Sequence, residues 1–302
     1  MTIVINSSSV QPCSVRLTAA DGYTLGALRY RMPVAARARL VIAGATGVPQ
    51  GFYRRFACFA AARGFDTLTF DYRGIGLSRP AALKGFEMEL LDWAYLDLTA
   101  AVAAMADPDL PLYLVGHSFG GHAFGLLPNH DLVRGCYLYG TGAGWHGYMP
   151  AAERLRVLAM WHLVLPPLTW WKGYSPWALL GMGEDLPANA YRQWRHWCRF
   201  PRYFFDDPAM AGIDAPYRAV STPMVAANAL DDLWALPASR DAFVQAYCNA
   251  PLTRLDIDPA SVGGRLGHMG YFKQIGALLW QQTLDWFDRR TDHAILATEH
   301  SA

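Results

Sequence analysis

The stretch LYLVGHSFGG at residues 112–121 decides the interpretation of the fold. Its apolar first half is typical of a short buried strand, and the residues after Gly120 can open a helix. A strand, the pattern Gly-x-Ser-x-Gly and a helix in succession are typical of a nucleophile elbow, which holds Ser118 on a sharp turn. Glycines flank the serine because the strand and the helix pass close to each other there. The pattern predicts an exposed, reactive hydroxyl group on Ser118.

The backbone N–H of Phe119 comes directly after this serine, at the start of the expected helix. In that position it can stabilise an oxyanion, because the N-terminus of a helix carries a partial positive charge. A five-residue match also occurs by chance, so the alternative is a glycine-rich turn whose serine has no catalytic role. The rest of the chain has to distinguish the two.

The composition is that of a globular protein of 302 residues, with 53% hydrophobic residues, 17% charged residues and a net charge of +1. This balance gives no sign of a nucleic-acid partner. The five cysteines are widely spaced and form no CxxC pair, so we expect buried free thiols in a cytoplasmic protein. We recognise no signal peptide and no membrane-spanning run, and the histidines lack the spacing of metal ligands. Neither a metal nor another cofactor is predicted.

Strands and helices are expected to alternate in the first half of the chain. Asp-Gly at residues 21–22 separates two strand-like runs and predicts a hairpin. Further apolar strands are expected at residues 39–43, 67–71 and 136–139, besides the elbow strand. Apolar strands without alternation indicate a mostly parallel sheet that helices cover on both faces. The predicted fold class is therefore α/β, with the chemistry beyond the carboxyl ends of the strands.

A segment rich in tryptophan interrupts this pattern at residues 141–216, and strand-like runs vanish there. We interpret it as a helical cap, or lid, inserted into an α/β core of residues 1–140 and 217–302. Its tryptophans are expected to line an apolar acyl pocket over Ser118 or, in the simpler interpretation, only to pack on the sheet. Four arginines at helical spacing give the segment a basic face: Arg192, Arg195, Arg199 and Arg202. That face is expected to be solvated, with contact to an anionic membrane surface as the alternative.

A nucleophilic serine needs a base, and the base needs an acid that orients it. Asp231 and Asp232 fall at the carboxyl end of a strand expected at residues 223–230, and His268 lies in the loop after the last expected strand. Serine, aspartate and histidine, each in a loop after a strand, come in the order expected for this elbow. Both aspartates are candidates for the acid.

The chain resembles the α/β-hydrolase family, and within it the bacterial predicted hydrolases of the serine aminopeptidase and monoglyceride lipase type. The resemblance covers about residues 15–288. The matching stretches, besides the elbow and the Asp-Asp and Gly-His loops, are residues 45–50, 70–78 and 183–187. The match is specific for the fold and the triad, and it is weak for the substrate because the family hosts many.

The resemblance implies that Ser118 attacks an acyl carbon, and that His268 takes the proton from Ser118 and later protonates the leaving group. It implies that Asp232 holds the tautomer of His268. We prefer Asp232 to Asp231 because relatives usually place the acid four or five residues before a proline, here Pro237.

The resemblance also implies that backbone N–H groups of Phe119 and Ala45 form the oxyanion hole, with Thr46 as the next candidate for the second donor. The implied activity is an esterase or lipase-like serine hydrolase that cleaves a small or medium apolar acyl ester through an acyl-enzyme, without a cofactor. An acyltransferase with the same triad and a non-catalytic small-molecule-binding protein on the same fold are the alternatives. The acyl chain, the leaving group and the oligomeric state are not predicted.

Three other residues are expected to be structural. His117 precedes the nucleophile, and Arg73 is expected to pair charges in a loop. An amphipathic helix is predicted over residues 87–105, on which Asp97 faces solvent or caps the helix.

Overall fold

The computed structural model describes residues 10–299, with side chains described to Thr291. Its centre is an eight-stranded sheet with the order β1-β2-β4-β3-β5-β6-β9-β10. β1 pairs antiparallel with β2 and β2 with β4, and the other five neighbouring pairs are parallel. The strands are β1 Cys13–Thr18, β2 Thr24–Tyr30, β3 Ala38–Ala43, β4 Phe65–Phe70, β5 Leu112–His117, β6 Val133–Tyr139, β9 Met224–Ala229 and β10 Leu252–Ile257.

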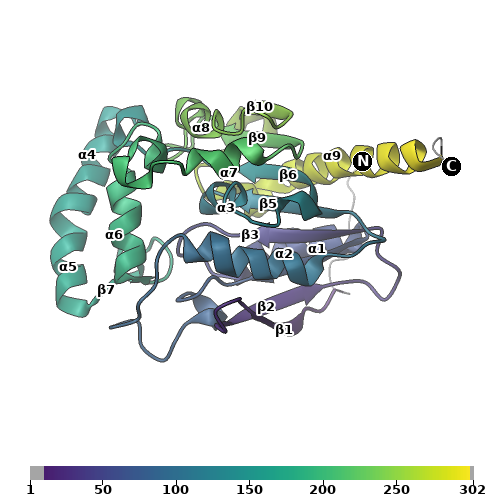
Figure 1. Ribbon diagram of the computed structural model, residues 1–302. Coiled ribbons are helices and arrows are strands. Elements are labelled where there is room, and N and C mark those ends of the chain that lie inside the picture. Colours follow the sequence, from purple (N-terminus) through teal and green to yellow (C-terminus); the bar gives the residue numbers. More distant parts are fainter. Residues whose placement is uncertain (1–9, 300–302) are drawn as a thin grey trace.

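Helices cover both faces of this sheet (Figure 1). Phe56 of α1 and Leu284 of α9 are buried in the core on one face. Val102 of α2, Phe124 of α3 and Phe243 of α8 are buried in the core on the other face. The helices are α1 Arg54–Ala62, α2 Thr99–Met105, α3 Phe119–Phe124, α8 Pro237–Val244 and α9 Ala277–Glu299. The predicted α/β class with a mostly parallel sheet is confirmed.

The segment between β6 and β9 is largely helical, as predicted, and α4, α5 and α6 stand together at one end of the sheet (Figure 1). Its elements are α4 Ala151–Ala159, α5 Leu165–Lys172, β7 Tyr174–Ser175, β8 Leu186–Pro187, α6 Ala188–Trp197 and α7 Asp214–Ala219. The short antiparallel pair β7 and β8 was not predicted. Whether this inserted segment acts as a lid stays a prediction.

The helix predicted over residues 87–105 begins later than its apolar pattern indicates. Regular helical structure starts near Trp93, runs as a π-helix to Leu98 and continues as α2. Before it, the N–H of Leu90 donates to the Gln193 side chain of α6 at 2.5 Å. The first predicted turn is lost because these residues bind the inserted segment instead of continuing the helix.

Asp97 on this helix does not face solvent, so that expectation is wrong. Its carboxylate is 0% exposed and accepts hydrogen bonds from Arg73 Nε and from the Arg73 backbone N–H, both at 2.8 Å. Arg73 also pairs with Asp21. The charge pairing expected for Arg73 is therefore present, with a partner that the helical periodicity had assigned to the surface.

The cysteines are all free, but only three of them are buried. Cys13 and Cys248 are exposed, which corrects the expectation that every thiol is buried. Among the side chains of residues 10–291, no His, Cys, Asp or Glu groups gather in a set of three or more that could hold a metal ion. In the same part of the chain, no helix combines the length and apolar character that crossing a membrane requires.

Candidate active site

Ser118 lies on the sharp turn between β5 and α3, with the backbone angles φ 52° and ψ −110°. A positive φ is rare for a residue with a side chain, and such strain concentrates at functional positions. The turn is closely packed: a Cβ atom on Gly120 would lie 2.2 Å from the carbonyl oxygen of Ala43. The predicted elbow geometry is therefore present, and only glycine fits at position 120.

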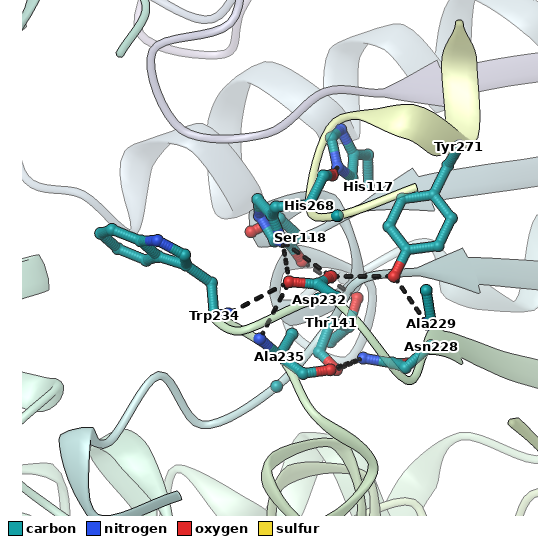
Figure 2. Close-up of polar contacts among 12 residues, drawn as sticks. His117, Ser118, Thr141, Asn228, Ala229, Asp232, Trp234, Ala235, His268 and Tyr271 are labelled. Carbon is teal, nitrogen blue, oxygen red and sulfur yellow. Dashed lines mark hydrogen bonds and ion pairs between the residues drawn. The ribbon is translucent and has the colours of Figure 1, made fainter. Parts of the chain in front are cut away.

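Asp232 and His268 form the polar centre of the site (Figure 2). The Asp232 carboxylate lies 2.9 Å and 3.0 Å from His268 Nδ1 through its two oxygens. One oxygen also accepts the backbone N–H groups of Trp234 and Ala235, each at 3.2 Å. The other accepts a hydrogen bond from the Tyr271 hydroxyl group at 2.8 Å. Every group that faces this carboxylate is thus a hydrogen-bond donor.

These donors keep Asp232 ionised although its side chain is 0% exposed. Burial raises the pKa of Asp232, but the charge and hydrogen bond of His268 and the hydroxyl of Tyr271 outweigh it, so the pKa lies below its ordinary value. An ionised carboxylate accepts a hydrogen bond from His268 Nδ1–H, so that Nε2 of a neutral imidazole is free to accept a proton.

Asp231 has a different role in the structure. Its two oxygens accept the backbone N–H groups of Leu266 and Gly267, both at 3.0 Å. Asp231 therefore fixes the loop that carries His268, whereas Asp232 binds the His268 ring itself.

The oxyanion loop and the loop of His268 are connected through two buried side chains, Tyr53 and His117. Ala45 N–H donates to Tyr53 Oη at 2.8 Å, and Tyr53 Oη lies 2.9 Å from His117 Nδ1. His117 Nε2 lies 2.9 Å from the carbonyl oxygen of His268. Burial, with a smaller contribution from nearby His268, lowers the pKa of His117 to about 3. His117 is neutral at physiological pH and holds the loop, in agreement with the structural role expected for it.

The bond from Ala45 to Tyr53 corrects the predicted oxyanion hole. Because the Ala45 N–H is already donated to Tyr53, it is not free to bind a substrate oxygen. Thr46 also lines the cavity, and its N–H has no acceptor among residues 10–299. The N–H of Phe119, in the first turn of α3, needs no partner within the helix. Phe119 and Thr46 therefore present the available backbone donors.

Ser118 and His268 line one cavity of about 590 Å³ beneath the inserted segment. The Ser118 hydroxyl makes no hydrogen bond within the described part of the chain, and its side chain is half-buried. Trp177 and Trp194 of the inserted segment contribute to the cavity wall, together with Trp234. Further apolar side chains and five glycines line most of the rest, and Arg156 and Lys273 are the charged members of the wall. The apolar ones include Ala45, Val48, Pro49, Phe52, Met182 and Met269.

Comparisons with known proteins agree with this geometry. A sequence model of the alpha/beta hydrolase family matches residues 40–295. The chain belongs to the alpha/beta hydrolase family. A search of curated proteins finds no match to the sequence.

Solved structures of a lipase and an esterase share the fold at low sequence identity. A soluble variant of monoglyceride lipase from Saccharomyces cerevisiae is 13% identical, with a TM-score of 0.65 over 96% of this chain and 99% of that chain. The esterase Pf2001 from Pyrococcus furiosus is 14% identical, with a TM-score of 0.58 over 94% of each chain. At such identities the likeness establishes the fold and leaves the substrate to the site itself.

Proposed function

We propose that this α/β-hydrolase is a serine hydrolase that cleaves carboxylic esters with a small or medium apolar acyl group. The observation that carries the proposal is the bond between buried Asp232 and His268, in the cavity that Ser118 also lines from a strained turn. Nucleophile, base and orienting acid are the three parts that acyl transfer to serine needs.

In the proposed reaction, Ser118 Oγ turns toward His268 Nε2, gives up its proton there and attacks the ester carbonyl carbon. The carbonyl oxygen becomes an oxyanion that accepts the N–H groups of Phe119 and Thr46. The tetrahedral intermediate then releases the alcohol, which takes the proton from His268, and leaves an acyl-enzyme. Water attacks the acyl-enzyme by the same steps, and the acid leaves while Ser118 regains its proton.

The substrate class follows from the cavity. A volume of about 590 Å³ with mostly apolar walls favours an apolar acyl chain. The inserted segment acts as the lid of this cavity and excludes water from it.

The inserted segment also carries two exposed tryptophans. Trp170 and Trp171 are 85% and 71% exposed next to Lys172, which favours contact with a membrane surface. A cytoplasmic location stays a prediction from the cysteine content.

Hydrolysis of p-nitrophenyl esters of rising chain length tests the proposal, with wild type compared with Ser118→Ala. We expect a burst followed by turnover in wild type, an optimum at a short or medium chain, and almost no activity in the variant. Turnover by folded Ser118→Ala at the wild-type rate would contradict the proposed mechanism. Product analysis with alcohols or thiols added at rising concentration separates hydrolysis from acyl transfer, and a folded wild type without a burst supports the binding-protein alternative.

A further inference from the structure

The hydrogen bonds through Tyr53 and His117 run in one direction only. A backbone N–H can only donate, so Tyr53 Oη accepts from Ala45 and its own proton is left for His117 Nδ1. His117 must then carry its proton on Nε2, from which it donates to the carbonyl oxygen of His268. Because burial keeps His117 neutral, this arrangement holds at physiological pH.

We propose that Tyr53 and His117 are positioning residues, which hold the oxyanion loop and the loop of the catalytic base in a fixed position relative to Ser118. The inference rests on the proposed ester hydrolysis and adds to it two residues that touch no substrate. His117 is the last residue of β5 and precedes Ser118 in the chain. The hydrogen bond from its ring therefore fixes the position of the His268 loop relative to the nucleophile.

The base is held from two sides in this arrangement. Asp231 accepts the N–H groups of Leu266 and Gly267, just before His268. His117 binds the carbonyl group of His268. Without His117, the carbonyl group of His268 itself would lose its hydrogen bond, and the ring would lose part of its alignment with Ser118.

Tyr53 also determines which backbone N–H groups are free to form the oxyanion hole. Tyr53 is 1% exposed, and its hydroxyl draws the Ala45 N–H into the core. With that N–H fixed inside, the N–H of Thr46 is the one left for the cavity. Tyr53 thus selects which amide of the loop can serve as the second oxyanion donor.

Tyr53→Phe tests the proposal because it removes the hydroxyl and keeps the ring, which packs edge-on against Phe272 with ring centroids 4.9 Å apart. Loss of an oxyanion donor, or a base misplaced by about 1 Å, lowers the rate of the chemical step about 100-fold. We therefore expect kcat and the rate constant of labelling by a fluorophosphonate to fall about 30- to 100-fold, while KM changes by less than about threefold.

Tyr113→Phe is the matched control. Tyr113 is also 1% exposed and lies on the same strand as His117, at the other end, where its hydroxyl bonds to Thr291 at 2.7 Å. We expect this variant to lose thermal stability but to label and turn over at the wild-type rate. Equal labelling rates in Tyr53→Phe and Tyr113→Phe would overturn the proposal, since a merely structural hydroxyl would affect both proteins in the same way.

Two variants of His117 complete the experiment. His117→Gln keeps an acceptor oxygen and a donor NH2 group and should retain much of the wild-type labelling rate, whereas His117→Leu has neither and should lose that rate as Tyr53→Phe does. Folded His117→Leu that is labelled as fast as His117→Gln would contradict the inference. If wild type itself is not labelled, the proposed function fails; if wild type is labelled and Tyr53→Phe is labelled equally fast, only the positioning role fails.

Discussion

Replacing Asp232 with asparagine exchanges one carboxylate oxygen for an NH2 group in a site that offers only hydrogen-bond donors. The oxygen that faces Trp234 and Ala235 meets two backbone N–H groups and has to stay an oxygen. The NH2 group therefore takes the other position, which faces Tyr271 and His268 Nδ1. There it donates to Nδ1 and drives the imidazole proton to Nε2, the atom that has to accept the proton of the nucleophile.

The magnitude follows from this tautomer change. A base whose accepting nitrogen is already protonated lowers kcat by about 10⁴-fold, which corresponds to about 5.5 kcal/mol of lost transition-state stabilisation. Asp231→Asn is the matched comparison, because the same exchange there disturbs a hydrogen bond to the loop and leaves the His268 ring with its carboxylate. It removes one N–H acceptor, at a cost of about 1–3 kcal/mol in the free energy of unfolding, and should lower kcat less than about tenfold.

Initial rates with p-nitrophenyl butyrate measure both effects, and thermal unfolding shows that both variants are folded. We expect the fold-loss of kcat in Asp232→Asn to be at least about 100 times greater than in Asp231→Asn. Equal losses in two folded variants, or more than a tenth of the wild-type kcat in Asp232→Asn, would refute the assignment of the acid.

Three further predictions concern packing, pH and the lid. Gly120→Ala places a methyl group 2.2 Å from a backbone oxygen and should cost at least about 3 kcal/mol of stability, whereas Gly51→Ala, with no atom within 4 Å of the new Cβ, should cost little; equal melting temperatures would contradict this. Burial lowers the pKa of His117 to about 3 and of His122 to about 4, so the unfolded chain binds more protons below the ordinary value of 6.5. The free energy of unfolding should thus fall by up to about 2.7 kcal/mol per pH unit between pH 6.5 and 4, and a flat profile in urea titrations would be inconsistent with neutral buried rings. Trp170→Ser should weaken binding to anionic vesicles at least about fivefold and leave hydrolysis of a soluble ester unchanged; unaltered vesicle binding would remove the case for membrane contact.

Much of the fold could be predicted from the sequence because its signals are local. The elbow strand, its glycines and the Asp-Gly hairpin each lie within a few residues of sequence, and the structure contains all of them. The two aspartates come just after β9, and His268 lies further along, in the loop that follows β10. The acid could be chosen only through the family resemblance, because Asp231 and Asp232 differ in what they face and not in their local pattern.

The errors come from contacts between distant parts of the chain. The helix predicted over residues 87–105 lost its first turn to a bond between Leu90 and α6, which periodicity does not report. Asp97 is buried because Arg73 lies opposite it, although its spacing on the helix resembles that of a surface residue. The family resemblance implies Ala45 as an oxyanion donor from its place in the loop after β3. Only the structure shows that the Ala45 N–H is donated to the Tyr53 hydroxyl. No local signal distinguishes Tyr53 from an ordinary core aromatic.

Intact-mass analysis after incubation with a fluorophosphonate shows whether Ser118 is an activated nucleophile. We expect one covalent adduct per chain on wild type and none on Ser118→Ala, because the elbow serine is the nucleophile that His268 and Asp232 activate. An adduct of the same extent on folded Ser118→Ala, or none on folded wild type, would contradict this assignment.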